Sequence, residues 1–251
     1  MDPQVSQPTQ ALIAAMIDHT QLNLLAEEEA IVAIRQLCHE AVQYGFYSVC
    51  VRPEHIAMAK EVLGDSPVKL ATVIGFPKKL VEKTAEQQTP TIGNPSTIEK
   101  LAEIGTCLAQ GVDELDVVLN VGCFQREAQT GEFLQTLAEL EKIYQAAQGC
   151  PIKLIIETDL LTETEIVQAT RLCHDAKMSM VKTCTGFVHG GLGATVPIVT
   201  LIRETLQGLE SPLGIKASGG IRSAEKALQL LQAGATRLGA SAGVQILQEL
   251  Q

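Results

Sequence analysis

Two kinds of hydrophobic pattern alternate along almost the whole chain. Short apolar runs rich in β-branched residues predict strands, and eight of them occur, at 16–20, 47–52, 68–76, 114–121, 152–160, 178–186, 214–220 and 236–241. Between them, apolar residues recur every three to four positions, which predicts amphipathic helices at 26–44, 96–111, 133–147, 162–176, 195–207 and 223–234. Helix-end signals support these boundaries, as with Ser223 before the last of these helices and Gly234 after it.

This alternation predicts a closed parallel barrel. Runs such as DVVLNV and KLIIE are apolar at successive positions, which is typical of strands covered on both faces of a parallel sheet. Eight strand-then-helix units close into a (β/α)8 TIM barrel, here with an N-terminal extension. No linker interrupts the pattern, so we expect one domain over 1–251. The alternative is an open doubly wound sheet, but no G-x-G-x-x-G follows the first strand.

One segment departs from the regular alternation of strand and helix patterns. Residues 78–96 separate the third strand from its helix by many more positions than the usual two to six, and they include two prolines and a TIGNP turn. In a barrel such a loop lies on the catalytic face. We therefore expect either a lid over the site or a surface decoration.

The composition narrows the possible partners and the compartment. The 251 residues include 19 Lys and Arg against 29 Asp and Glu, a net charge of -10, which gives no field attracting nucleic acid or an anionic membrane. The first residues form no basic leader, and the apolar run ALIAAMI is too short to span a bilayer. Seven cysteines without a C-x-x-C pair indicate reduced thiols rather than a zinc cluster. We expect a cytoplasmic protein.

Four ionisable residues lie within runs that otherwise read as buried strand: Asp18, Asp116, Lys182 and Lys216. A buried charge costs several kcal/mol unless it is paired, so we expect all four to point into the barrel and meet. One interpretation is a pair of structural salt bridges. A salt bridge, however, needs no second lysine nearby, whereas amine chemistry benefits from one.

The second interpretation is imine chemistry. A free lysine is almost wholly protonated at pH 7 and does not attack a carbonyl. Desolvation and a neighbouring cation lower a lysine pKa, so Lys182 is the candidate nucleophile and Lys216 the charge that keeps it neutral. The imine formed with an aldehyde acts as an electron sink. Asp116, acting through a water and Lys216, is the candidate acid/base.

Glycines after the last three strands predict a phosphate site. Gly219 and Gly220 follow the seventh strand, Ser241 follows the eighth, and Gly186 follows the sixth. Phosphate commonly binds at this place in barrels, on loop amides and a helix N-terminus. Backbone amides would hold the phosphate, so an acidic protein would need no basic surface to bind it.

Other polar residues are weaker candidates. Five scattered histidines show no metal-ligand spacing, and His19, next to Asp18, alternates away from the barrel centre. Cys50 and Cys184 read as packed thiols. Arg52 and Asn120, at strand ends, fit either substrate contacts or loop hydrogen bonds.

At these residues the chain resembles the deoxyribose-phosphate aldolases. The resemblance rests on ordered blocks over most of the chain, namely IDHTQL, YGFYSVCVRPEHI, ATVIGFP, GVDELDVVLNVG, KLIIETDLL, MVKTCTGF, IKASGGIRSAEKAL and LGASAG. The most specific feature is V-K-T-x-T-G-F followed by K-A-S-G-G-I-R. In this family a short glycine-containing loop usually follows the GFP motif, where this chain has the longer 78–96 segment.

The resemblance implies a class I aldolase without metal or other cofactor. Such an enzyme reversibly cleaves 2-deoxy-D-ribose 5-phosphate into acetaldehyde and D-glyceraldehyde 3-phosphate in deoxyribonucleoside breakdown, usually as a cytoplasmic homodimer. By position, Lys182 forms the imine, Lys216 perturbs it and Asp116 transfers protons. The implied substrate-binding residues are Asp18, Thr185, Gly186, Gly219, Gly220 and Ser241.

Two other functions fit the same barrel. One is different chemistry, such as that of a sugar-phosphate isomerase or a transaldolase-like enzyme, and the lysine pair argues against it. The other is a catalytically silent sugar-phosphate-binding protein. Neither involves a nucleic acid or membrane partner.

Overall fold

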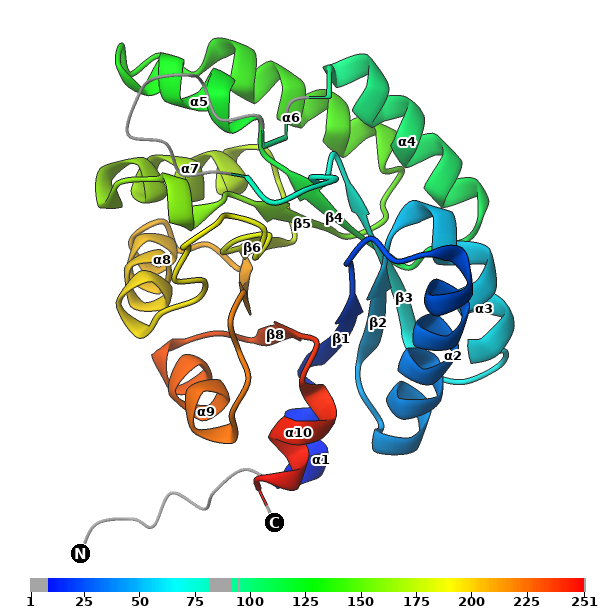
Figure 1. Cartoon of the computed structure of the whole chain (residues 1–251). Helices are drawn as coiled ribbons and strands as arrows, with labels where there is room; N and C mark the ends of the chain where they lie inside the picture. Colours follow the sequence, from blue (N-terminus) through cyan, green and yellow to red (C-terminus); the bar gives the residue numbers. More distant parts are fainter. Residues whose placement is uncertain (1–8, 82–91, 94, 251) are drawn as a thin grey trace, which may run out of the picture.

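The computed structural model describes residues 9–81, 92–93 and 95–250, and the eight predicted strands close into one parallel barrel there (Figure 1). Each strand pairs with the next along the chain, and the eighth pairs with the first. The predicted (β/α)8 barrel is confirmed, and the alternative of an open sheet is wrong.

The strands are shorter than the apolar runs that predict them. They are β1 (Ile17–Gln21), β2 (Ser48–Val51), β3 (Lys69–Ile74), β4 (Glu114–Val118), β5 (Ile152–Ile155), β6 (Met180–Lys182), β7 (Gly214–Ser218) and β8 (Arg237–Ala240). The runs continue past the sheet as loops at the carboxyl ends of the strands. Those loops form the face on which barrels carry their sites.

Six helices match the predicted ones to within two residues, namely α2 (Glu27–Tyr44), α4 (Thr97–Ala109), α6 (Leu134–Ala146), α7 (Glu163–Asp175), α8 (Val196–Gly208) and α9 (Ala224–Ala233). Side-chain caps fix several starts. Ser96 and Thr162 form capping boxes at α4 and α7, and Ser223 caps α9, which ends at Gly234 with a left-handed φ of 119°.

Shorter helical segments complete the ring. They are α1 (Gln10–Ala14), η1 (Pro53–His55), α3 (Ile56–Leu63), α5 (Val121–Ala128), η2 (Thr158–Leu160) and α10 (Gly243–Gln248). Helix α1 occupies the predicted N-terminal extension and packs against α10, where the Gln10 side-chain amide donates to the Leu247 carbonyl at 2.7 Å (Figure 1).

The apolar core has two parts. The larger packs the outer faces of the strands against the helices, and the smaller lies inside the barrel, where Cys50, Val73, Val118 and Ile155 converge. Apolar side chains therefore fill one side of the interior. The charged groups lie on the other side of the interior.

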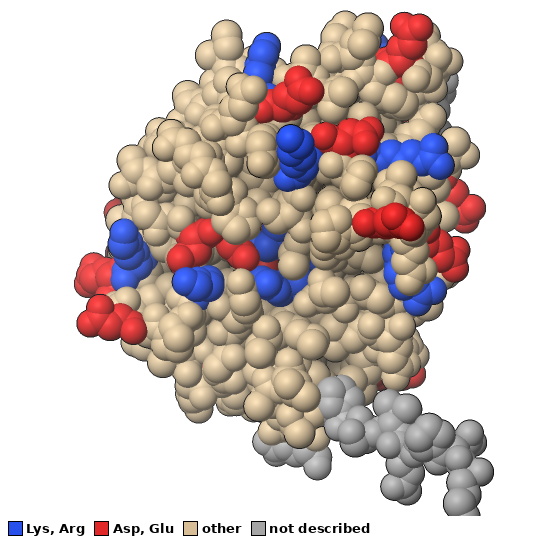
Figure 2. Space-filling model, turned by 180° about the vertical axis from the view of Figure 1, so that it is seen from behind, with Lys and Arg blue, Asp and Glu red and all other residues tan. Residues whose placement is uncertain are grey.

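Two surface features concern the expected partners. In Figure 2 acidic and basic side chains intermingle over the visible face, with no broad basic area. No helix in the described ranges combines the length and the apolar character that crossing a bilayer requires.

The long segment after β3 is only partly described. Residues 82–91 and 94 lie outside the described residues, so the expectation of a lid or a decoration falls there. On its near side, Val81 forms a parallel bridge with Val188, and on its far side Ile92 is fully buried. The described ends of the segment thus pack against the site face of the barrel.

Candidate active site

The four charged residues singled out in the sequence meet inside the barrel. Asp18 comes from β1, Asp116 from β4, Lys182 from β6 and Lys216 from β7, and each side chain is at most 4% exposed. Lys182 and Lys216 are register partners on neighbouring strands. The parallel pairing therefore places the two lysines at one level of the barrel.

Both lysines bind the same carboxylate oxygen. The Nζ atoms of Lys182 and Lys216 each lie 2.7 Å from Oδ2 of Asp116. Two atoms at that distance from one oxygen are separated by at most twice that length. The two amines therefore converge on Asp116 inside the barrel, where we expect the four charged residues to meet.

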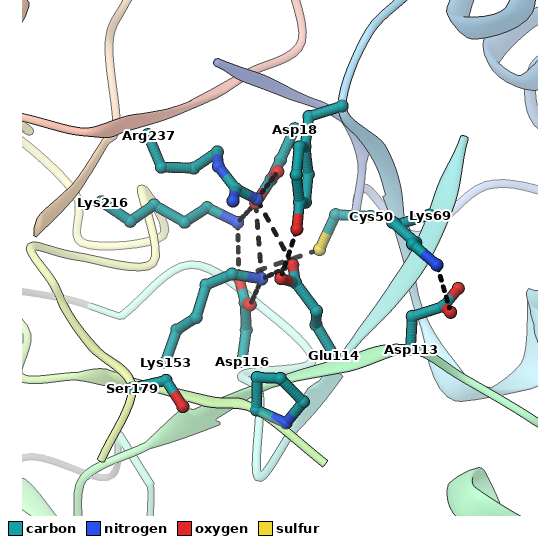
Figure 3. A network of polar contacts seen from close by, with 12 residues as sticks. Asp18, Cys50, Lys69, Asp113, Glu114, Asp116, Lys153, Ser179, Lys216 and Arg237 are labelled. Atoms are coloured by element: carbon teal, nitrogen blue, oxygen red, sulfur yellow. Dashed lines mark hydrogen bonds and ion pairs between the residues drawn. The ribbon is translucent and has the colours of Figure 1, made fainter. Parts of the chain in front are cut away.

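Three further charged residues, which sequence reasoning missed, extend the cluster (Figure 3). Lys153 of β5 lies 2.9 Å from Asp116 Oδ1, 2.6 Å from Glu114 Oε2 and 3.5 Å from Asp18 Oδ2. Arg237 of β8 lies 2.9 Å from Asp18 Oδ1 and 3.4 Å from Glu114 Oε2. The expected group of two cations and two anions is thus larger, with four cations and three anions.

An aromatic ring closes the bottom of the cluster. The Arg237 guanidinium carbon lies 3.3 Å from the centre of the Tyr47 ring, and the Tyr47 hydroxyl donates to Glu114 Oε1 at 3.3 Å. The ring covers the guanidinium face, and stacking of this kind stabilises a desolvated cation. Arg237, Glu114 and Tyr47 therefore seal the cluster on the side away from the pocket.

The ion pairs outweigh desolvation in this cluster. Burial raises the pKa of Asp116, but Lys153, Lys182 and Lys216 hold it well below its ordinary value. Burial also raises the pKa of Asp18, but Lys216, Lys153 and Arg237 lower it below its ordinary value. Burial lowers the pKa of Lys216, but Asp116 and Asp18 raise it above the ordinary lysine value. Both carboxyl groups are anions and Lys216 is a cation at neutral pH.

The cluster is unbalanced when every amine is protonated. Lys153 contacts three carboxylates, Lys216 contacts Asp18 and Asp116, and Arg237 contacts two. Within the described part of the chain, Lys182 pairs with Asp116 alone. Lys182 is therefore the cation of the cluster with the fewest ion pairs.

A pocket of about 230 Å³ opens above the lysine pair, at the carboxyl ends of β6, β7 and β8. Lys182 is the one member of the charged cluster that lines it. The other predicted residues that line it are Thr185, Gly186, Gly219, Gly220 and Ser241. Asp18 does not line the pocket. It is fully buried and ion-paired to Lys216, so the structure places it behind the second lysine rather than beside a ligand.

The two glycine-rich loops of the pocket interlock. The Ala194 N–H donates to the Gly219 carbonyl at 3.1 Å, and a Cβ placed on Gly193 would lie 2.3 Å from that same oxygen. Gly186 faces Gly219 across this contact, with a left-handed φ of 77°. Arg222, which the sequence did not single out as a site residue, also lines the pocket and adds a cation to it.

One group of described residues offers three atoms of metal-ligand type within 4.8 Å of one another: Glu157, Asp159 and Cys184. Their hydrogen bonds already occupy them. Thr185 donates to Glu157, backbone N–H groups donate to Asp159, and the Cys184 thiol donates to the Ser218 carbonyl at 2.9 Å. Burial raises the pKa of that thiol well above its ordinary value. This group is hydrogen-bonded structure, and we assign no metal to it.

The weaker sequence candidates have structural partners. His19 points outward, with Nε2 2.8 Å from Glu40 of α2, as its alternation predicts. Arg52 donates to the carbonyls of Leu22 and Pro77, and Asn120 caps α5. Arg52 and Asn120 therefore make loop hydrogen bonds.

The cysteine candidates are packed thiols. Cys50 lies 3.9 Å from Asp116 Oδ2, and burial raises its thiol pKa to about 11. Cys184 is also fully buried. Both observations agree with the interpretation of these residues as packed side chains.

Comparison with known proteins finds one consistent group. The sequence model of DeoC/LacD family aldolases matches residues 12–249. A deoxyribose-phosphate aldolase of Mannheimia succiniciproducens is 41% identical over 239 residues, which cover 95% of each chain.

Solved structures agree. A crystal structure from Coccidioides immitis, provisionally assigned as a deoxyribose-phosphate aldolase, matches with a TM-score of 0.84 and 36% identity over 97% of this chain and 87% of that one. A tetrameric deoxyribose phosphate aldolase from Aeropyrum pernix matches with a TM-score of 0.77 and 29% identity, over 96% and 92% of the two chains.

Proposed function

Because this chain belongs to the DeoC/LacD aldolase family, we propose that it is a class I aldolase acting on a deoxyribose phosphate through an imine on Lys182. The substrate we propose is 2-deoxy-D-ribose 5-phosphate, cleaved reversibly into acetaldehyde and D-glyceraldehyde 3-phosphate. The observation that carries the proposal is the single Asp116 oxygen shared by Lys182, which lines the pocket, and Lys216, which lies behind it.

The cleavage direction begins at Lys182. As a neutral amine it attacks the C1 aldehyde of the open-chain sugar, and loss of water with uptake of one proton, proposed to come from Lys216, leaves a protonated imine. A base removes the proton of the C3 hydroxyl, the C2–C3 bond breaks, and its electron pair passes to the iminium as an enamine. Carbon C3 becomes the aldehyde of glyceraldehyde 3-phosphate. The enamine then takes a proton at C2, and water releases acetaldehyde.

Asp116 and Lys216 are the proposed proton carriers. Both lie next to Lys182, and the short contacts of Asp116 with both amines form a path for protons between them. Asp18 holds Lys216 from the side opposite the pocket, which makes it a positioning residue in this scheme. The amine supplies the electron sink, so the proposed chemistry calls for neither metal nor organic cofactor.

The anionic end of the substrate is proposed to lie against the glycine-rich loops. Thr185, Gly186, Gly219, Gly220 and Ser241 surround the end of the pocket at the carboxyl ends of β6 to β8. Barrel enzymes frequently bind phosphate at this place through backbone amides.

The proposals on assembly and location extend beyond the site. We propose a homodimer, although one related protein is a tetramer. The seven cysteines are all free thiols, which fits the proposed cytoplasmic location.

Reductive trapping tests the proposal. Incubation with acetaldehyde and borohydride should leave an ethyl group on Lys182, located by peptide mass spectrometry, and Lys182→Arg should abolish both the label and turnover of 2-deoxyribose 5-phosphate. Addition of a chelator should leave turnover unchanged.

Other outcomes overturn parts of the proposal. A label on another lysine would move the imine, and a chelator-sensitive activity without any label would remove the imine mechanism. Binding of the sugar phosphate without turnover by the wild type would favour a silent binding protein.

A further inference from the structure

Glu157 is a buried carboxyl group that the proposed chemistry does not use. It lies two residues after the end of β5 and is fully buried, although its backbone adopts the left-handed conformation with φ of 62°. A side chain with a Cβ rarely adopts that conformation, and it persists only where surrounding contacts hold it. The contacts that hold Glu157 point to what it does.

Both carboxylate oxygens of Glu157 engage one residue. The Thr185 hydroxyl donates to Oε2 at 2.6 Å, and the Thr185 N–H lies 3.3 Å from Oε1 and 3.2 Å from Oε2. The hydroxyl oxygen also accepts from the Phe187 N–H at 3.0 Å. Since a hydroxyl has one proton, accepting from Phe187 fixes the direction in which Thr185 donates.

Thr185 and the two residues after it form one wall of the pocket. Thr185, Gly186 and Phe187 line it, three to five positions after Lys182, whereas Glu157 stands behind this wall and lines no part of it. A backbone hydrogen bond ties the two segments together, because the Thr158 N–H donates to the Thr183 carbonyl at 2.9 Å. Glu157 therefore acts on the pocket through Thr185.

We propose that Glu157 is a positioning residue that holds the 185–187 wall in the conformation that receives the anionic end of the substrate. The proposal rests on the proposed function, since that function supplies the phosphate. A neutral carboxyl supports the wall without repelling the phosphate. An ionised one adds a negative charge behind it and weakens phosphate binding.

The groups around Glu157 set its charge. Burial raises its pKa to about 7, the hydrogen bonds from Thr185 oppose that rise, Asp159 adds to it and Lys182 lowers it. The neighbouring Cys184 thiol stays protonated, because burial raises its pKa well above the ordinary value. Glu157 is thus placed to change charge near neutral pH, with Asp159 in η2 and Lys182 in β6 as its charged neighbours.

Two variants separate the effect of the Glu157–Thr185 hydrogen bonds from the effect of the charge on Glu157. Glu157→Gln keeps an acceptor for the Thr185 hydroxyl and cannot ionise, whereas Glu157→Leu removes the acceptor. For Glu157→Leu, kcat/KM on 2-deoxyribose 5-phosphate should fall at least about 10-fold more than kcat/KM on unphosphorylated 2-deoxyribose, because only the first substrate needs the wall. Glu157→Gln should restore most of that loss.

The pH profile is the second readout. From pH 6 to 8.5 the KM of the wild type for the phosphorylated sugar should rise about 3- to 10-fold relative to that of Glu157→Gln, the effect expected of one charge acting over several ångströms through a polar medium. The ratio cancels the titration of the phosphate itself. Glu139→Gln is the matched control, since Glu139 is a buried carboxyl paired with Lys100 outside the barrel, and it should leave both ratios unchanged.

Several results would overturn the inference. They are equal losses of kcat/KM on both substrates in Glu157→Leu, no loss of kcat/KM in that variant, or KM profiles against pH that run parallel in the wild type and Glu157→Gln. If Glu157→Leu fails to fold, the Gln profile decides alone. Calorimetric titration with inorganic phosphate gives the same pH comparison without turnover, so a wild type inactive on 2-deoxyribose 5-phosphate would refute the proposed function and still leave this inference tested.

Discussion

Among the four cations of the cluster, Lys153 has the most ion pairs. It contacts three carboxylates and is 1% exposed, and those carboxylates raise its pKa well above the ordinary value against the opposing effect of burial. In the proposed mechanism, Lys153 and Lys216 still neutralise Asp116 when Lys182 becomes part of an imine. Lys153 would thus keep the proposed acid/base group ionised while the charge of its neighbour changes.

Replacing Lys153 should be costly. Lys153→Met leaves Asp18, Glu114 and Asp116 short of a partner, and breaking a buried ion pair from one side typically costs about 3–5 kcal/mol. Urea denaturation at pH 7 measures the loss. Lys69→Met is the matched control, because the ion pair of Lys69 with Asp113 is half exposed and should be worth less than about 1 kcal/mol. Equal effects would contradict the role given to Lys153.

Lys216 has a different expected effect, on rate rather than on stability alone. Lys216→Leu removes the cation beside Lys182 and a proton carrier, so kcat at pH 7 should fall by about 100-fold or more. Steady-state rates from pH 6 to 10 check this. A profile that overlays that of the wild type would contradict the cation-neighbour mechanism.

The sequence predicts four of the seven charged residues of this cluster by one criterion, a charge inside an apolar strand. The same criterion applies to Lys153, but the run KLIIE was read as uniformly apolar. Glu114 was recoverable too, since it precedes Asp116 by two positions and therefore shares its face of β4. Arg237 opens β8 and pairs in register with Lys216, and only the strand register shows that it points inward.

At the scale of elements, the pocket depends on how the loops after β6 and β7 meet. Gly193 and Gly219 are in close contact, and both have a left-handed φ. There is no room for a side chain at Gly193, because a Cβ would strike the Gly219 carbonyl. One loop cannot move without displacing the other.

Gly193→Ala should therefore change substrate binding. The new methyl group pushes the Gly219 loop away from the pocket, and we expect KM for 2-deoxyribose 5-phosphate to rise by about 10-fold, the effect of losing roughly 1.4 kcal/mol of binding. Gly131→Ala is the control, because Gly131 has a similar φ of 77° with open space around it. It should lower the free energy of unfolding by about 1 kcal/mol and leave KM unchanged. Equal KM values in both variants would contradict the inference that the contact between Gly193 and Gly219 shapes the pocket.

Strand positions were predicted from the sequence, but strand ends were not. The run 178–186 reads as one strand, yet pairing stops at Lys182 and the rest turns into the pocket wall. An apolar pattern reports burial, and these residues are buried whether or not they pair. Short helices such as α5 lack enough turns for a periodic signal and depend on packing, with Asn120 as the cap.

For the whole molecule, buried ion pairs link stability to pH. The pKa values of Asp18 and Asp116 are depressed in the folded state, so their contribution to stability is fully present above about pH 4, where they are ionised in the unfolded chain as well. That contribution is lost as the pH falls further, because the unfolded state then takes up protons first. Glu157, with its pKa raised to about 7, has the opposite sign and costs stability as the pH rises from about 4.5 to 7.

Acid titration of stability tests this link. The free energy of unfolding of the wild type should fall steeply as the pH drops below about 4, and that of Asp116→Asn should fall less over the same interval, since one carboxyl with a depressed pKa is gone. Urea denaturation at half-unit steps gives both slopes. Identical slopes would show that Asp116 does not contribute to the acid sensitivity.

The barrel itself was predictable because each strand-then-helix unit carries its own pattern, and only a few folds satisfy eight of them. The closure of β8 onto β1 is a property of the complete chain and is seen only in the structure.

The packing of α1 against α10 has a practical consequence. Gln10 touches Leu247, so the first and last helices are neighbours, although the whole barrel lies between them in the chain (Figure 1). A short peptide bridge joining these helices, with new ends cut at the exposed Gly131 turn, would give a circularly permuted enzyme with the same strand order around the ring.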